Sequence, residues 1–432
     1  MAHIPSGAPL LPQNDDGWQA AADSGAPVVY PFFVIALIFL VALPKGGIAV
    51  GGLPVTFGYL LLGVFAPLAV LAAIRRGGPP PAALANFFFG FVPIATLAMF
   101  KLLTTGSQTS SLIYAVILLL LPALFLLVYS PILEMLSERQ IGTPLKWAMR
   151  FVVVWGLMNF LLFAFTRNLI EIPYLTVNPL NVGEVYSKNN SRGLLMKLVS
   201  TYNNGNVFGI CMVMLLPVYW YFEKSRLWLG LFVLATALSL SRTVWVGLVL
   251  AMVGMIWSGQ LKLSRPIVWV SLAGLVLVVI ALLPLMGWTT ERVVDTEMGG
   301  RMLQWDQIEL SFLGEQKVRI SEVLYAGLLQ SFGVLGALLA LIAFAFPLIY
   351  GVANQNLLSP LRRGAVVSVA CYLLMATSDA AFIYPPTIAI LLAVSVLVYR
   401  RGHHDSYAGG KPFVPTGKIG VLTLAEAAER SR

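Results

Sequence analysis

Apolar runs of about 20 residues recur along almost the whole chain and are separated by short polar stretches. A helix of roughly 20 apolar residues is long enough to cross the hydrocarbon core of a bilayer. The pattern predicts an all-α polytopic membrane protein with about twelve transmembrane helices, although the two short runs beside Arg242 also fit one kinked hairpin. The predicted spans are 27–44, 54–74, 82–100, 111–130, 147–166, 205–222, 227–241, 243–258, 267–287, 321–350, 364–378 and 380–400.

The composition excludes an ordinary soluble protein. Of the 432 residues, 58% are hydrophobic and only 11% are charged, and the mean hydropathy is +0.84. Water does not solvate such a chain, so residues 27–400 are predicted to form one transmembrane domain. Residues 1–26 and 401–432 flank it as polar ends. An even number of spans places both ends on the same side of the membrane.

Basic residues in the short connections predict which side that is. Cytoplasmic loops are enriched in Lys and Arg, and here these residues fall on alternate sides of the spans, so both ends are expected to be cytoplasmic segments. Residues 1–26 carry three Asp and no Lys or Arg, unlike a signal peptide, so the first span is expected to be retained. The basic residues concerned are Arg75, Arg76, Arg139, Lys146, Arg150, Lys224, Arg226, Lys262, Arg265, Arg362, Arg363, Arg400 and Arg401.

Several kinds of chemistry find no support in the residues. The two cysteines, Cys211 and Cys371, fall inside predicted spans and have no spacing typical of a disulfide or metal site. The three histidines lie near the chain ends, which excludes an imidazole base on the outer face. No nucleotide-binding motif is present. We therefore expect no metal, no cofactor and no nucleic-acid partner.

The outer face is predicted to carry two long connections, at about 167–204 and 288–320. Long connections in compact proteins are often functional, and these two are rich in basic groups on the side where the positive-inside bias disfavours them. Each group alone fits a solvated surface charge, but the set fits an anionic ligand. Its members are Arg167, Lys188, Arg192, Lys197, Arg292, Arg301, Lys317 and Arg319.

Arg242 adds to this set. The segment LSLSRTVW, which ends at Trp245, places Arg242 at the outer membrane boundary between two apolar runs. A charged group there faces a cavity or a partner, or else its long side chain reaches the lipid headgroups. A planar guanidinium suits bidentate binding of a phosphate or diphosphate.

The predicted helix that begins at Ser321 combines an acid with glycines. At 100° per residue, Glu322, Leu329, Gly333 and Gly336 fall on nearly one face, where a neighbouring helix or lipid chain can approach closely. Glu322 lies at the outer boundary of this face. The alternative is an acid in the first helical turn, capped by Ser321 and stabilised by the helix dipole.

Three motifs together resemble the bacterial O-antigen ligase and Wzy-type polysaccharide polymerase superfamily. They are the YNNGN stretch at 202–206, the LSLSRTVW segment, and the helix from Glu322 through Gly333 and Gly336. The ligases have a His followed by Gly eleven residues later and by a small residue three further on. Glu322 stands at the position of that His, so the chain is more similar to a Wzy-type polymerase of the exopolysaccharide (xanthan-like) branch.

The resemblance implies a GT-C-like fold in the bacterial inner membrane, with the active site facing the periplasm. It implies an inverting, metal-independent glycosyl transfer. An oligosaccharide on undecaprenyl diphosphate serves as donor, and a sugar hydroxyl on a second lipid-linked unit serves as acceptor. A flippase and a chain-length copolymerase are the protein partners that the resemblance suggests.

The resemblance also suggests residue roles. Arg242, Arg192 and Arg319 are expected to bind the diphosphate, and Glu322 is the expected base. Asp379 is open to three readings: a partner of Arg242, an alternative base, or a cap of the last helix. The candidates for sugar or secondary contacts are Arg301, Arg292, Asn203, Asn204, Trp305 and Asp379.

Other functions compete with this hypothesis. Twelve spans and a basic cavity also suit a transporter or flippase of lipid-linked glycans, an O-antigen ligase, or a non-catalytic partner in an export complex. Transporters are commonly built from repeated halves with interrupted helices near the midplane. The sequence has no evident repeat, and its polar groups gather at the outer face, so an enzyme is favoured.

Overall fold

The computed structural model describes residues 29–50, 53–75, 78–105, 109–187, 190–192, 195–262, 301–315, 323–379 and 385–401, together with a few isolated positions. Most of these residues are helical. Six helices are long and apolar enough to cross a bilayer, so the chain is a multi-pass helical membrane protein. They run over Phe57–Arg75, Pro81–Thr104, Ile113–Met135, Glu138–Thr166, Gly205–Phe222 and Leu324–Ala353.

These six helices coincide with six of the predicted spans. Two of them contain π-helical turns, which widen the helix locally. The long helices consist of α2 (Phe57–Arg75), α3 (Pro81–Ala85), η2 (Asn86–Phe91), α4 (Val92–Thr105), α5 (Thr109–Ala115), η3 (Val116–Leu120), η4 (Ala123–Tyr129), α6 (Ser130–Met135), α7 (Glu138–Thr166), α8 (Gly205–Phe222) and α14 (Leu324–Ala353).

The remaining described helices are shorter than a bilayer crossing. They are Val29–Ala42, α9 (Arg226–Ala237), α10 (Arg242–Trp257), α13 (Met302–Asp306), α15 (Pro360–Met375) and α16 (Pro385–Tyr399). At about 1.5 Å per residue, the 12 residues of α9 extend only about 18 Å. The predicted span 267–287 lies mainly outside the described residues. The number twelve therefore stays a prediction.

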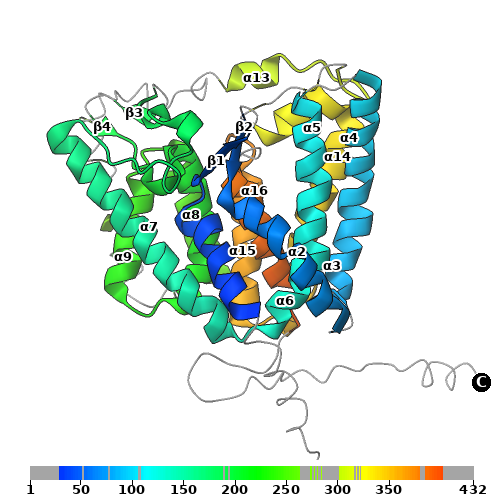
Figure 1. Cartoon of the computed structure of the whole chain (residues 1–432), viewed down its shortest axis with the longest axis horizontal. Coiled ribbons are helices and arrows are strands. Elements are labelled where there is room, and N and C mark those ends of the chain that lie inside the picture. Colours follow the sequence, from blue (N-terminus) through cyan, green and yellow to red (C-terminus); the bar gives the residue numbers. More distant parts are fainter. Residues whose placement is uncertain are drawn as a thin grey trace, which may run out of the picture.

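Two short hairpins interrupt the helical architecture, so the expectation of a purely α fold was wrong in this detail. β1 (Gly47–Val50) pairs antiparallel with β2 (Leu53–Thr56), and β3 (Ser191–Arg192) pairs with β4 (Leu195–Met196). All four strands and α13 lie at the top of Figure 1, on what we call the Asp379 face. The opposite end, at which α3 and α6 lie in Figure 1, we call the Arg400 face.

Helix α8 lies at the centre of the core. Nearly all of its side chains are buried, including Phe208 and Tyr219, and it packs against α10, α15 and α16. Its N-terminus lies at the Asp379 face, where Asn204 caps it by accepting hydrogen bonds from the backbone of Asn206 (2.8 Å) and Val207 (3.3 Å). The most rigidly packed helix therefore presents its first turn to that face.

The Arg400 face is held together by buried polar contacts. Arg400 donates to the backbone oxygen of Leu133 (3.1 Å), which ties the end of α16 to α6. Arg150 and Glu223 form a two-pronged ion pair, with Nε–Oε2 at 2.9 Å and Nη2–Oε1 at 3.1 Å. Burial raises the pKa of Glu223, but hydrogen bonds from the Ser225 backbone and from Arg150 outweigh burial and leave this pKa below its usual value.

Helix α14 is broken at Gly333. This residue has φ +67° and ψ −168°, a conformation that side chains rarely adopt. The segment 311–315 fills the break: Ser311 and Phe312 accept hydrogen bonds from the N–H groups of Val334 (3.0 Å) and Leu335 (3.2 Å). A Cβ on Gly333 would lie 2.4–2.5 Å from backbone atoms of this segment. The neighbour of Gly333 is therefore a loop, not the helix or lipid chain that the sequence suggested. The prediction that Glu322, Leu329, Gly333 and Gly336 share one face of an unbroken helix was wrong, because the helix is interrupted at Gly333.

We expect Gly333→Ala to destabilise the protein by about 2 kcal/mol or more, because the left-handed backbone is strained for alanine and its methyl group meets the 311–315 backbone. Gly63→Ala in α2 is the matched control, since nothing lies within 4 Å of its Cβ position. Thermal unfolding in detergent measures both variants. Equal melting temperatures would contradict the packing of this loop into the break.

Candidate functional site

Asp379 is the acidic centre of the Asp379 face. It follows the last turn of α15, and its backbone N–H donates to Met375 (2.9 Å). Its side chain is only 4% exposed. One carboxylate oxygen, Oδ2, accepts hydrogen bonds from Arg301 Nη2 (2.8 Å) and Asn206 Nδ2 (2.7 Å). The buried carboxylate is therefore paired with a charged donor and an amide donor.

Asn206 extends this contact to a lysine. Its Oδ1 accepts a hydrogen bond from Lys197 Nζ at 2.7 Å, while its Nδ2 donates to Asp379. Gly205 makes this arrangement possible, because a Cβ there would lie 2.5 Å from the Lys197 side chain. The result is a continuous chain of polar contacts from Lys197 through Asn206 and Asp379 to Arg301.

Three arginines from separate segments lie near enough for their charges to interact here. Arg192 belongs to β3, Arg242 is the first residue of α10, and Arg301 directly precedes α13. Burial lowers the pKa of Arg192, and the positive charges of Arg242 and Arg301 lower it further. An arginine nevertheless stays protonated at neutral pH. Like charges held together in this way favour the binding of an anion.

A buried asparagine holds the turn before α8 in place. Asn190 Nδ2 donates to the backbone oxygens of Val185 (2.9 Å) and Asn203 (3.0 Å), and its Oδ1 accepts from the Gly205 backbone (3.1 Å). Asn203 has a left-handed backbone, with φ +58°, which asparagine tolerates better than most residues. Sequence reasoning did not name Asn190 or Asn206 as site residues. Asn206 belongs to the YNNGN motif and Asn190 lies in a long connection, and neither position shows by itself which side chains it contacts.

The structure brings four of the predicted site residues together: Arg192, Arg242, Arg301 and Asp379. Asp379 is engaged by Arg301 and Asn206. Residues 380–384 lie outside the described part of the chain, so its reading as a cap of the last helix stays a prediction. Its role as a base stays a prediction.

The two asparagines predicted as sugar contacts, Asn203 and Asn204, have structural roles at the start of α8. Asn204 caps α8, and Asn203 forms the turn before it. A sugar contact by either side chain stays a prediction. Among the described residues, no three or more His, Cys, Asp or Glu side chains lie close enough together to hold a metal ion.

Helix α13 is anchored to the start of α14. Gln304 Oε1 accepts a hydrogen bond from Ser321 Oγ (2.7 Å), and Gln304 O accepts one from Gln330 Nε2 (3.2 Å). Trp305, next to Gln304, is partly exposed.

Helix α14 begins at Leu324, so the expected start at Ser321 was three residues early. Several predicted site residues lie outside the described part of the chain: Glu322, Arg319, Arg292, Lys188 and Lys317.

Comparison with known proteins adds no family to this picture. No protein-family model matches the chain, and no curated protein matches it. The function is therefore inferred from the residues themselves and from their arrangement on the Asp379 face.

We expect the arginine cluster to bind inorganic pyrophosphate and thereby to raise the melting temperature of the purified protein, since a ligand that binds only the folded state stabilises it. Arg192→Gln and Arg242→Gln should each weaken this binding about tenfold or more, the loss of one charge-assisted hydrogen bond. Arg226→Gln is the control, because Arg226 is exposed at the start of α9. Calorimetric titration measures the affinities, and equal affinity in all four proteins would rule out the site.

We expect Asp379 and Arg301 to be energetically coupled. Asp379→Ala and Arg301→Ala should each destabilise the protein, because each leaves a partly buried charge without its main partner. The double variant should be more stable than the sum of the two losses predicts, with a coupling of about 1–3 kcal/mol. A double-mutant cycle of unfolding free energies measures this coupling. Strict additivity would show that the ion pair holds nothing in place.

Proposed function

We propose that this protein is a Wzy-type glycosyltransferase that polymerises undecaprenyl-diphosphate-linked oligosaccharide units into an exopolysaccharide. The observation that carries the proposal is the cluster of Arg192, Arg242 and Arg301 on one face of a multi-pass membrane protein. Planar guanidinium groups at a membrane boundary suit a lipid-linked diphosphate, which is anionic and lies at the same depth.

The proposed orientation places the Asp379 face in the periplasm of a bacterial inner membrane. Basic residues of the opposite face support it, because the positive-inside bias assigns them to the cytoplasm. Arg75 ends α2, Arg226 begins α9, and Arg400 follows α16 at that face. The Asp379 face carries cations too, among them Arg192, Arg242 and Arg301 of the cluster and Arg167 at the end of α7.

The proposed reaction is a displacement at the anomeric carbon of the donor glycan. The bond from this carbon to the diphosphate oxygen breaks, and a bond to the acceptor hydroxyl oxygen forms. The electron pair leaves with the diphosphate, and the hydroxyl proton passes to a protein base. Positive groups placed beside the departing diphosphate stabilise the charge that develops there. Arg192 and Arg242 take this role, with Arg319 as a further member by the sequence resemblance.

Asp379 acts in this proposal as a positioning residue. Its Oδ2 already accepts hydrogen bonds from Arg301 and Asn206, so this oxygen is occupied by protein donors. The base is therefore assigned to Glu322. Glu322 lies outside the described residues, so this assignment rests on the sequence resemblance.

Transport is the second candidate, and one observation favours it. A helix broken inside its length, like α14 at Gly333, is common in transporters, where the free ends of the half-helices bind substrate or ions. Here the N–H groups of Val334 and Leu335 donate to loop carbonyls. These two N–H groups are therefore already used within the protein and do not bind a substrate. An enzyme remains the better proposal.

The proposal is tested with purified protein in lipid vesicles that contain undecaprenyl-diphosphate-linked repeat units and a chelator, but no nucleotide sugar or ATP. We expect a ladder of longer lipid-linked chains. Glu322→Gln and Arg242→Ala should each reduce the rate at least 100-fold, because a group that acts in the transition state is removed. Arg226→Ala, a cation removed from the opposite face, should retain the ladder.

Two outcomes contradict the proposal. Unchanged single units in a demonstrably folded preparation would favour transport, which a fluorescent glycolipid translocation assay in the same vesicles then measures. A ladder that survives both substitutions would remove Glu322 and Arg242 from the mechanism.

A further inference from the structure

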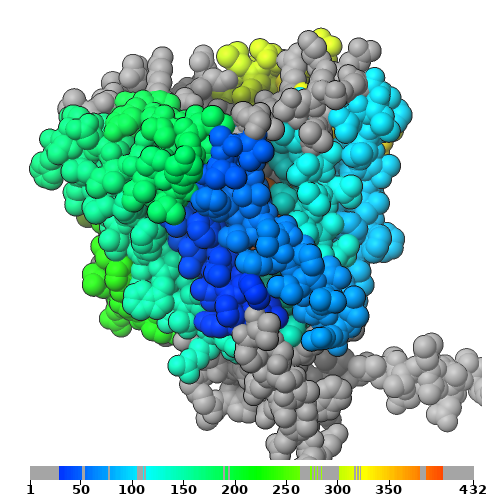
Figure 2. Space-filling view, in the orientation of Figure 1, coloured from blue at the N-terminus to red at the C-terminus, as the bar shows by residue number. Residues whose placement is uncertain are grey.

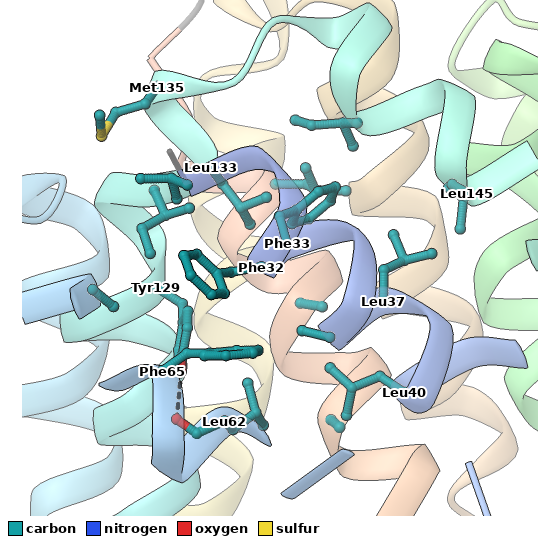
Figure 3. A pocket seen from close by; sticks show the side chains of 18 of the residues that line it. Phe32, Phe33, Leu37, Leu40, Leu62, Phe65, Tyr129, Leu133, Met135 and Leu145 are labelled. Atoms are coloured by element: carbon teal, nitrogen blue, oxygen red, sulfur yellow. Dashed lines mark hydrogen bonds between the residues drawn. The ribbon is translucent and has the colours of Figure 1, made fainter. Parts of the chain in front are cut away.

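An apolar cavity lies on the side of the molecule away from the arginine cluster. It has a volume of about 380 Å³ and is bounded by the Val29–Ala42 helix, α2, η4 and α6, α7, α8 and α16. Figure 3 shows Phe32 and Leu37 of the first helix, and Leu62 and Phe65 of α2, around it. Figure 2 shows these two N-terminal elements, in blue, on the surface of the molecule. The cavity therefore lies behind the N-terminal helices.

The depth of the cavity matches one leaflet of a bilayer. On the first helix the lining runs from Val29 to Val41, and on the antiparallel α2 it runs from Leu62 to Arg75. At about 1.5 Å per residue, each stretch covers roughly 18–20 Å, about two thirds of a hydrocarbon core of about 30 Å, so it spans one leaflet and ends a few Å past the midplane. The lining on α2 extends to its last residue, Arg75, at the Arg400 face. The cavity therefore belongs to the leaflet on that side.

The lining chemistry selects a hydrocarbon chain. Apart from Arg75 and the hydroxyl of Tyr129, which bonds to the backbone oxygen of Leu62, every lining side chain is apolar. An apolar cavity of about 150 Å³ stays dry and takes up benzene. A volume of about 380 Å³ holds more than two such molecules, which corresponds to a chain of roughly a dozen carbons.

Arg75 supplies a charge at the mouth. It is the one charged side chain among the described residues that line the cavity, it is exposed, and it ends α2. A guanidinium at this level lies among lipid headgroups and binds a phosphate through two parallel hydrogen bonds. An apolar chain with a phosphate at its end is the chemistry of a membrane phospholipid.

We propose that this cavity binds one acyl chain of an anionic glycerophospholipid from the leaflet at the Arg400 face, with Arg75 on the lipid phosphate. The site is independent of the proposed glycosyl transfer, because its charged end and the arginine cluster lie at opposite faces. A lipid-linked diphosphate bound at the cluster has its charge at the Asp379 face, whereas Arg75 at the end of this cavity lies at the Arg400 face. The bound chain packs beside the Phe32 and Phe65 rings, whose centroids are 4.7 Å apart, and stabilises the contact between the first helix and α2.

The test is native mass spectrometry of delipidated protein after exchange into vesicles of phosphatidylglycerol, of phosphatidylcholine, or of phosphatidylcholine with undecaprenyl phosphate. We expect retained phosphatidylglycerol and a higher melting temperature with it. Ala69→Trp fills the cavity from α2 and should reduce retention at least tenfold. Val64→Trp is the control, since Val64 lies on the same helix, is 67% exposed and does not line the cavity.

Arg75→Gln keeps the cavity intact and should abolish the preference for phosphatidylglycerol over phosphatidylcholine while leaving chain binding. Ala393→Phe fills the cavity from α16 and gives a second variant if Ala69→Trp fails to fold. Three results overturn the proposal: no retained phosphatidylglycerol, retained undecaprenyl phosphate in its place, or equal retention by the filled and control variants. Failure of the polymerisation assay leaves these results unaffected, because neither filled position belongs to the arginine cluster.

Discussion

A carboxylate that is almost completely buried must be paired, and the arrangement of the Asp379 face follows from this requirement. Asp379 is held by Asn206 of α8 and by Arg301 before α13. One side chain thus joins the end of α15, the start of the central helix and the second long loop. Lys197 extends the network into the first loop through Asn206. Without the carboxylate, Lys197, Arg192, Arg242 and Arg301 would repel one another with no negative charge between them.

The same face combines rigid and adjustable parts. Helix α8 is fixed by its buried sides and by the Asn204 cap, so Asn206 occupies a defined position. Arg192 and Arg301 reach the cluster from the two long connections, whose backbones are held by side chains such as Asn190 and Gln330. Under the proposed function, a diphosphate at this face would meet donors from three segments, and its charge would offset the repulsion among the arginines.

Hydropathy predicted the long helices. It also predicted that Arg192, Arg242, Arg301 and Asp379 lie near one membrane boundary, because charged side chains are costly to bury in lipid and are therefore found at the ends of apolar runs. The contacts among these residues were not predictable, since they depend on helix order. The strands were missed because they are short: β1 and β2 have four residues each, and β3 and β4 have two. The break at Gly333 was missed because a count of 100° per residue assumes an unbroken helix. Glycine is compatible with both helical and non-helical backbone, so its presence in the sequence does not show which one it adopts.

The repair of this break has a consequence for how the chain enters the membrane. Ser311 and Phe312, which accept hydrogen bonds from Val334 and Leu335, precede α14 in the sequence and are therefore synthesised first. When the segment after Gly333 moves into the bilayer, the acceptors for its first N–H groups already exist on the preceding stretch of chain. The loop and the helix can then insert as a hydrogen-bonded pair, and those two donors need not enter hydrocarbon unsatisfied.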